Sequence, residues 1–144
     1  MKSVGDLLAK KGSGVHATRR GATVMEAARA MNAAHVGAMV VTDGDRVVGI
    51  FTERDVLNRV VAAGRNPEST TVGDVMTSPV ACCAPRTTLD ECRRVMREKR
   101  IRHLPVVDEG RLHGIVSIGD LNEFEIGEQD ETIHYLNDYL YGRT

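Results

Sequence analysis

The stretch Gly-Ile-Phe-Thr-Glu-Arg-Asp at residues 49–55 recurs 65 positions later as Gly-Ile-Val-Ser-Ile-Gly-Asp at residues 114–120. The similarity extends around both stretches. Residues 21–56 and 86–121 align without a gap and share 10 of 36 residues, where random pairing at ordinary residue frequencies would give about two. A shorter match upstream pairs residues 4–7 with 72–75. The chain is therefore predicted to be an internal duplication, and the repeat sets its architecture.

Each copy has the same predicted order of elements. A short apolar strand leads into a Thr-x-x-Glu pattern, starting at Thr23 or Thr88, which is typical of a helix start. Apolar residues at helical spacing follow and predict a helix that packs on a sheet. Next come two β-rich stretches joined by a turn, which predict a hairpin, and then a second helix. The predicted hairpin strands are 38–42 with 47–51 and 104–107 with 112–116, after first strands at 14–17 and 79–82.

The predicted fold class is mixed α and β (α+β). Two β-α-β-β-α repeats are expected to pack through their sheets about a pseudo-two-fold axis, because each repeat alone would leave one sheet face exposed. Residues 65–71 are polar and rich in breakers, so they are predicted to link a first repeat at 1–64 to a second at 72–124. A helical tail is predicted over 125–144, with Ile133, Leu136 and Leu140 on one face.

Composition narrows the classes of function. Of 144 residues, 42% are hydrophobic and 27% charged, as in ordinary globular domains. The net charge of -1 and the aromatic content of 3% favour neither a nucleic-acid nor a membrane partner. No N-terminal apolar segment resembles a leader, and no apolar stretch approaches the ~18 residues that span a bilayer. Because the three cysteines, Cys82, Cys83 and Cys92, cannot supply a disulfide framework, a cytoplasmic location is expected.

The repeated unit resembles the CBS-domain family, named after cystathionine β-synthase. The resemblance rests on residues 49–55 and 114–120 and on Arg-His-Leu-Pro-Val-Val-Asp at residues 102–108. It covers about residues 4–122 and is to the small stand-alone bacterial type. It implies a Bateman module, a non-catalytic regulatory unit of signal transduction that is often a homodimer. Such a module needs no obligatory cofactor and binds AMP, ADP, ATP, NAD(H) or S-adenosylmethionine in two clefts between its repeats.

The resemblance also implies the site residues. The family has a Gly-h-h-Ser/Thr-x-x-Asp pattern, in which h is a hydrophobic residue. By resemblance, this pattern places Asp55 and Asp120 on the ribose hydroxyls, and Thr52 and Ser117 on ribose or phosphate. A carboxylate can accept from two vicinal hydroxyls at once, although each motif is also a plain capping box with a purely structural role. Backbone of the first strands would contact adenine, and which of these strands meets which aspartate stays open. The residues that would contact adenine are Val15, His16, Ala17, Thr18, Ala81, Cys82, Cys83 and Ala84.

The two clefts are predicted to be unequal. Arg102 and His103 precede the second hairpin, where other members of the family place basic residues against phosphates, whereas the first repeat has Gly37 and Ala38 there. The cleft that Arg102 and His103 reach is therefore predicted to prefer a phosphorylated ligand, with Arg54 as a further phosphate contact. The remaining basic run, residues 93–100, is predicted to be a solvated helix face.

Three hypotheses of function follow. The first is a non-catalytic adenine-nucleotide sensor that acts on a separate partner protein. The second is a structural or interaction protein whose clefts are empty. The third is a small enzyme that uses Cys82 or His103, but no set of nucleophile, base and orienting residue recurs at one place. No metal site is predicted, because cysteine and histidine pairs at metal-ligand spacing are lacking.

Overall fold

Two β-hairpins form the centre of the molecule, at the positions that the repeat predicts. The computed structural model describes residues 2–12 and 14–127. Strand β2 (Ala38–Asp43) pairs antiparallel with β3 (Arg46–Thr52), and β4 (His103–Asp108) pairs in the same way with β5 (Arg111–Ser117). Each hairpin has one register shift, after Val41 in the first and after Val106 in the second. The two register shifts lie 65 residues apart, at the same offset as the sequence repeat. Both predicted hairpins are confirmed.

The first strand of each repeat is shorter and lies later than predicted. β1 (Ala17–Thr18) runs parallel to β2, and the second repeat has only the bridge between Cys83 and Val106 in its place. In the first repeat the Val40 N–H donates to the His16 carbonyl oxygen over 3.1 Å. The position that corresponds to Val40 is Pro105, which has no N–H to donate. The predicted strand over 79–82 is therefore wrong, and that over 14–17 holds only at its last residue.

The predicted helix starts are present. Thr23 caps α2 (Val24–Ala34) by accepting from the Glu26 N–H, and Thr88 caps α5 (Leu89–Lys99) by accepting from the Glu91 N–H. Thr52 begins α3 (Glu53–Asp55), which continues as the π-helix η1 (Val56–Val61), and residues 118–127 are helical after β5. Such caps satisfy amides that have no acceptor within the helix.

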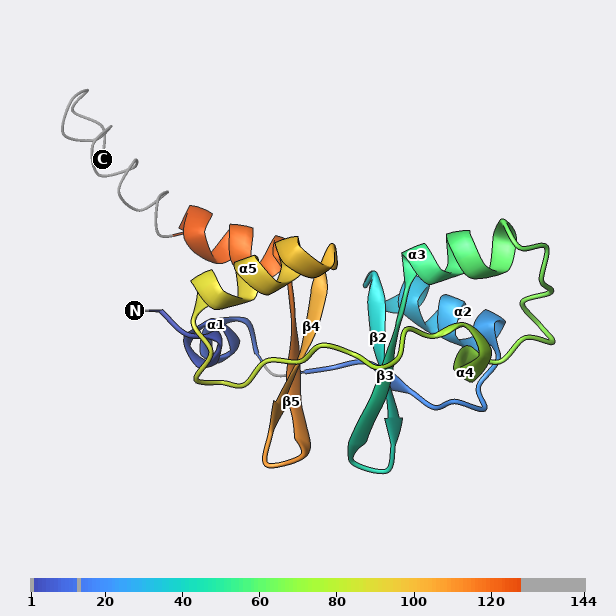
Figure 1. Ribbon diagram of the computed structural model, residues 1–144, viewed down its shortest axis with the longest axis horizontal. Helices are drawn as coiled ribbons and strands as arrows, with labels where there is room; N and C mark the ends of the chain where they lie inside the picture. The colour runs from blue at the N-terminus through green and yellow to red at the C-terminus, as the bar shows by residue number, and fades with distance from the viewer. Residues whose placement is uncertain (1, 13, 128–144) are drawn as a thin grey trace, which may run out of the picture.

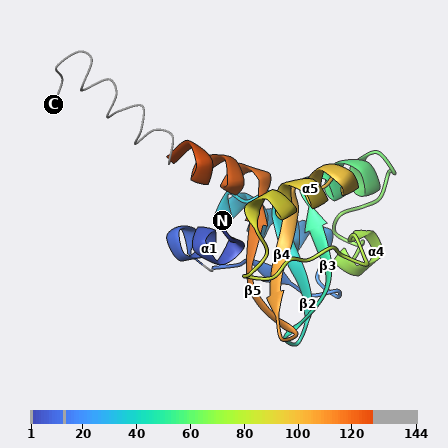
Figure 2. The same ribbon diagram turned by 60° about the vertical axis from the view of Figure 1, so that its left-hand side comes forward.

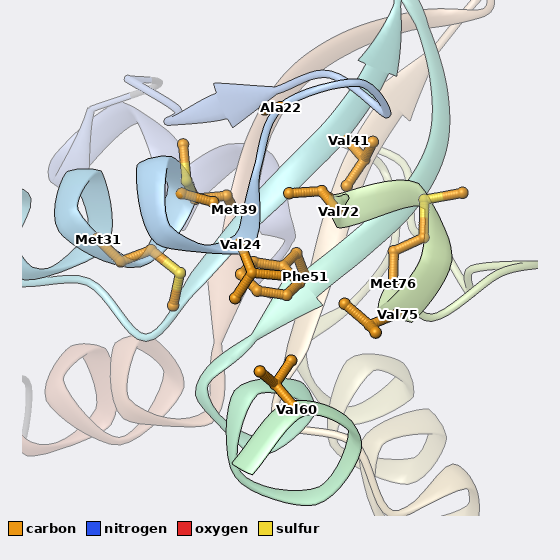
Figure 3. Close-up of a cluster of buried hydrophobic side chains, with 11 residues drawn as sticks. Ala22, Val24, Met31, Met39, Val41, Phe51, Val60, Val72, Val75 and Met76 are labelled. Atoms are coloured by element: carbon orange, nitrogen blue, oxygen red, sulfur yellow. The ribbon is translucent and has the colours of Figure 1, made fainter. Parts of the chain in front are cut away.

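Two further helices cross between the repeats. Helix α1 (Val4–Lys11) precedes the first sheet but packs into the second hydrophobic core, next to β4, β5 and α5. Helix α4 (Val72–Val75) precedes the second sheet but packs into the first core. Figure 3 shows Val72, Val75 and Met76 gathered near Phe51 with side chains of α2 and η1. Each core is therefore completed by a helix from the other half of the sequence.

The helices lie on the outer sides of the two hairpins. Figure 1 shows the hairpins side by side in the middle, with α1 and α5 beyond one and α2, α3 and α4 beyond the other, and β3 contacts β5 between them. Figure 2 shows the second hairpin in front of the first after the molecule is turned. The fold is α+β with small sheets, as predicted. Within the described residues no helix is both long and apolar enough to cross a membrane. The predicted face of Ile133, Leu136 and Leu140 lies outside those residues.

Candidate functional site

A cavity of about 560 Å³ lies where the two repeats meet. The first repeat contributes the end of β3 together with α3 and η1, and the second contributes residues 99–103 at the start of β4. Thr77 and residues 79–81, which follow α4 and lead into the second repeat, form a third wall. Segments that are far apart in the sequence therefore share one cavity. Of the predicted site residues, its wall holds Thr52, Arg54, Asp55, Ala81, Arg102 and His103.

Asp55 is fixed by hydrogen bonds on the first-repeat side of this cavity. Its Oδ2 accepts from the Thr52 N–H at 3.0 Å and from the Thr52 hydroxyl at 3.2 Å, while its own N–H donates to Thr52 Oγ1 at 3.3 Å. Its Oδ1 accepts from the Thr77 hydroxyl at 3.2 Å. The side chain is 7% exposed. The capping box is thus formed, and it presents to the cavity a carboxylate of set orientation that can accept further hydrogen bonds.

Arg59 joins the π-helix to the end of α4. Its Nη1 donates to the carbonyl oxygens of Val75 and Met76 at 3.2 and 2.9 Å, and its Nε lies 3.7 Å from Asp55 Oδ1. Carbonyls at the end of a helix lack an intrahelical donor, so the guanidinium satisfies them. π-helical turns are frequent at functional sites. Here the turn connects the aspartate of the motif to the helix that completes the first core.

Positive charge exceeds negative charge around the cavity. Arg54 and Arg59 come from the first repeat, and Lys99, Arg100 and Arg102 come from the second; they face the two carboxylates of Glu53 and Asp55. The chain as a whole carries a net charge of -1. A local excess of three positive charges in so nearly neutral a chain makes this cavity attractive to an anion.

His103 lies where charges from both repeats converge. Burial lowers the pKa of its imidazole below the ordinary value, and the nearby cations Lys11 and Arg102 act in the same direction. The carboxylates of Asp120 and Glu53 oppose this effect by raising the pKa. A neutral imidazole offers one N–H donor and one acceptor, and a phosphate beside it would favour the protonated ring.

The second motif is built like the first but contacts a lysine of the chain itself. The Ser117 N–H donates to Asp120 Oδ2 at 2.8 Å, and the Asp120 N–H donates to Ser117 Oγ at 3.0 Å. Lys11 Nζ lies 2.6 Å from the same Oδ2. Ser117 and Asp120 are not on the wall of the 560 Å³ cavity. The two copies of the motif therefore have different surroundings.

Of the eight residues predicted to contact adenine, Ala81 lies on the cavity wall, beside Pro79 and Val80. The first-repeat aspartate thus faces the segment that enters the second repeat, a pairing that the sequence left open. Cys83 lies in the sheet instead, where its N–H donates to the Pro105 carbonyl at 3.0 Å. The others lie away from the cavity: Ala17 and Thr18 line a separate hollow of about 390 Å³, and Val15, His16, Cys82 and Ala84 line neither.

Other residues of the cavity wall were not predicted as site residues from the sequence. Lys99 and Arg100 are exposed, as predicted for the basic run, but they also line the cavity, which was not predicted. Helix α5 ends at Lys99, and Arg100 adopts a left-handed conformation with φ of 56°. Residues other than glycine rarely adopt this conformation, so nothing in the sequence marks the turn. Thr77 lies 22 residues from Asp55 along the chain, and only the tertiary fold brings the two together.

Two of the three cysteines, Cys82 and Cys83, have a raised thiol pKa. Burial raises the pKa of the Cys82 thiol, and a hydrogen bond with Cys92 together with burial raises that of Cys83. A raised pKa keeps a thiol protonated and weakly nucleophilic. Among residues 2–12 and 14–127, no group of three or more His, Cys, Asp or Glu side chains is placed to hold a metal ion.

Known proteins share this architecture. The family model described as CBS domain matches residues 4–62 and 72–127. The mitochondrial CBS domain-containing protein CBSX3 of Arabidopsis thaliana is 37% identical over 125 residues, which cover 83% of this chain. The chain spans 61% of that relative's length and 54% of the length of the protein MK0525 from Methanopyrus kandleri.

Two solved structures extend the comparison. A protein with CBS domains from Burkholderia ambifaria, assigned to signal transduction, is 37% identical with a TM-score of 0.85, covering 89% of this chain and 96% of its own. The hexameric CBS-CP12 protein from bloom-forming cyanobacteria is 26% identical with a TM-score of 0.70, covering 88% of this chain and 83% of its own.

Proposed function

The chain belongs to the CBS-domain family, as a tandem pair of its repeats, and from this premise we propose that it is a non-catalytic nucleotide sensor. Its ligand is an adenosine-containing molecule, AMP, ADP, ATP, NAD(H) or S-adenosylmethionine, bound in the cavity at Asp55. One observation supports this above all: the Thr52–Asp55 motif and the excess of cationic side chains share that single cavity. The signal-transduction assignment of the relative from Burkholderia ambifaria agrees with a regulatory role.

The proposed binding mode gives each wall a task. The Asp55 carboxylate accepts from the two ribose hydroxyls, which distinguishes ribose from deoxyribose. Arg102, His103 and Arg54 contact the phosphates. The adenine lies against the small apolar segment that contains Val80 and Ala81. A phosphorylated ligand is preferred over adenosine, because charge-assisted hydrogen bonds are stronger than neutral ones.

Such a ligand would couple the two repeats. It would touch Asp55 in the first repeat and Arg102 in the second, so its binding free energy would depend on how the repeats are placed. A ligand shifts a conformational equilibrium only by its differential affinity for the two states. We propose that this shift is what a separate regulated protein detects.

Catalysis by Cys82 or His103 finds no support in the site. Cys82 lies away from the cavity wall and its thiol has a raised pKa, whereas a nucleophilic cysteine needs a lowered one. His103 is on the wall, but the two hydroxyl groups on the described wall, those of Thr52 and Thr77, donate to Asp55 and are not presented to His103 as a base. Incubation with ATP or NADH followed by product analysis tests this directly: no turnover is expected, and formation of a product would contradict the proposal.

Replacing Arg102 with alanine is expected to weaken ATP binding about tenfold and to leave adenosine binding unchanged. The guanidinium would contact only phosphate, and losing a charge-assisted hydrogen bond at an exposed position costs about 1.4 kcal/mol, the lower end of the usual range. Titration calorimetry with both ligands measures this difference. Arg94→Ala, the same substitution at an exposed position of α5 outside the cavity wall, is the matched control. Equal ATP affinities of the two variants would contradict the phosphate role.

A second copy of the chain is the partner that we propose from the family resemblance. Large apolar side chains are exposed near the cavity: Leu57 is 60% exposed and Val61 66%, both on η1. A second copy would remove this apolar area from water. Oligomeric assembly occurs in the related hexameric CBS-CP12 protein. Light scattering should give the mass of two chains, and the double variant Leu57→Glu with Val61→Glu should give one. A wild-type mass of one chain would contradict this part of the proposal.

The cytoplasmic location stays a prediction.

A further inference from the structure

We propose that Lys11 occupies the aspartate of the second motif, so that each chain binds one nucleotide although its sequence carries two ribose motifs. This inference rests on the proposed function, since it takes the second motif to be able to bind ribose when it is free. Lys11 Nζ lies 2.6 Å from Asp120 Oδ2 and donates to the Ile115 carbonyl oxygen at 2.8 Å. The ammonium group thus binds both the motif and the strand that precedes it.

The position of Lys11 is set by the crossed helix. It is the last residue of α1, whose Val4, Leu7 and Leu8 are buried in the second core. Leu8 packs so closely on β5 that a Cβ at Gly114 would lie 3.1 Å from its Cδ2. Because the helix cannot move away without opening that core, the ammonium group is held beside Asp120 in the folded protein.

The corresponding place in the first repeat has no such group. Residues 4–7 match residues 72–75, so Leu8 corresponds to Met76 and Lys11 to Pro79. Met76 packs on Gly49 as Leu8 packs on Gly114. Three residues further on, Pro79 lines the open cavity, and its ring has no polar atom that could reach Asp55. Asp55 does have a cationic neighbour, Arg59, but Arg59 Nε lies 3.7 Å from Asp55 Oδ1, and its Nη1 donates to the Val75 and Met76 carbonyl oxygens instead. The two halves therefore share the same packing and differ in whether a cation reaches the aspartate at hydrogen-bond distance.

The ion pair would compete directly with a ribose. A carboxylate bound to an ammonium group at hydrogen-bond distance makes a charge-assisted bond of about twice the strength of a neutral one, and ribose hydroxyls would replace it with neutral donors. The first motif also has more cationic support for a phosphate, because Arg54 and Arg102 line its cavity together with Lys99 and Arg100, whereas His103 interacts electrostatically with Asp120 as well. The intrachain contact is thus favoured at Asp120, and the ligand at Asp55.

Equilibrium dialysis of the full chain against radiolabelled AMP tests the inference through the number of molecules bound per chain at saturation. Wild type should bind one. Lys11→Met, which keeps the apolar stem and removes the charge, should bind two, and adding Asp120→Asn to it should restore one. Lys10→Met is the matched control: its ammonium group lies 5.6 Å from the centre of the Phe124 ring rather than on the aspartate, so one bound AMP is expected.

Each departure from these numbers has a defined meaning. Two AMP molecules per wild-type chain, or one AMP on both the wild-type and the Lys11→Met chain, would overturn the role of Lys11 and leave the proposed function standing. No binding to either protein would overturn the proposed function, and this inference with it. One AMP per Lys11→Met chain that disappears with Asp120→Asn, and none per wild-type chain, would support the occupation of Asp120 and contradict the site at Asp55.

Discussion

Replacing Asp55 with asparagine is expected to weaken ATP binding about 10- to 100-fold, since a hydrogen bond to a charged group contributes roughly 1.5–3 kcal/mol. The amide that replaces the carboxylate keeps one carbonyl oxygen, which can still accept from the Thr52 N–H and so preserve the helix start. It loses the charge and one acceptor, so it cannot receive both ribose hydroxyls in the way a carboxylate can. The affinity for ATP should therefore fall much more than the free energy of unfolding.

Two comparisons separate binding from capping. Asp45→Asn makes the same chemical change in the exposed hairpin turn and should leave both affinity and stability unchanged. Asp120→Asn makes the same change in the second motif and should weaken ATP binding far less than Asp55→Asn does, because Lys11 already occupies that carboxylate. Calorimetry gives the affinities and urea denaturation the stabilities. Wild-type affinity in the Asp55→Asn chain would mean that Asp55 is a structural cap and nothing more.

Replacing Leu7 with alanine is expected to lower the free energy of unfolding by about 2–5 kcal/mol, the usual cost of truncating a buried leucine. Leu7 is 2% exposed and lies in the second core, although it belongs to the first repeat in the sequence. The loss should therefore appear in the second half of the molecule. Amide hydrogen exchange should accelerate in β4 and β5 more than in β2 and β3.

Leu112→Ala serves as the comparison for this variant. Leu112 lies on β5 but is only partly buried, so its truncation should cost less than that of Leu7. A loss at Leu7 no larger than that at Leu112, or exchange that accelerates mainly in β2 and β3, would contradict the crossed arrangement of α1. The result also bears on Lys11, because the same helix holds both residues.

The elements that local sequence specifies were predictable. Thr23 and Thr88 begin helices at equivalent positions of the two copies, because the side-chain oxygen of each accepts from the backbone N–H of a glutamate three residues later. The hairpins follow from apolar stretches on either side of short turns. Aligning the two copies added what neither copy shows alone, namely that the Thr52–Asp55 pattern is repeated in one structural context. Local patterns and duplication thus gave the fold class and the central residues of the cavity.

What depends on distant contacts was not predictable. The crossing of α1 and α4 arises from the packing of Leu7 and Val72 into cores formed by the opposite repeats, and the repeat itself gives no sign of it. The left-handed turn at Arg100 brings Lys99 and Arg100 to the cavity without a glycine to mark it. Pro105 has no N–H to donate where Val40 donates in the first repeat, so the strand predicted over residues 79–82 does not form. The Lys11–Asp120 contact joins residues 109 positions apart.

The central claim is that the cavity at Asp55 binds an adenosine-containing nucleotide, and thermal denaturation of the wild-type chain tests it most directly. The chain is heated alone and with AMP, ADP, ATP, NAD+, NADH or S-adenosylmethionine in turn. A ligand that binds only the folded state, at 100 times its Kd, adds about 2.7 kcal/mol to stability, which raises Tm by on the order of 10 °C for a domain of this size. We predict such a rise with at least one of the six ligands, lost in Asp55→Asn. An unchanged Tm with all six would contradict the claim.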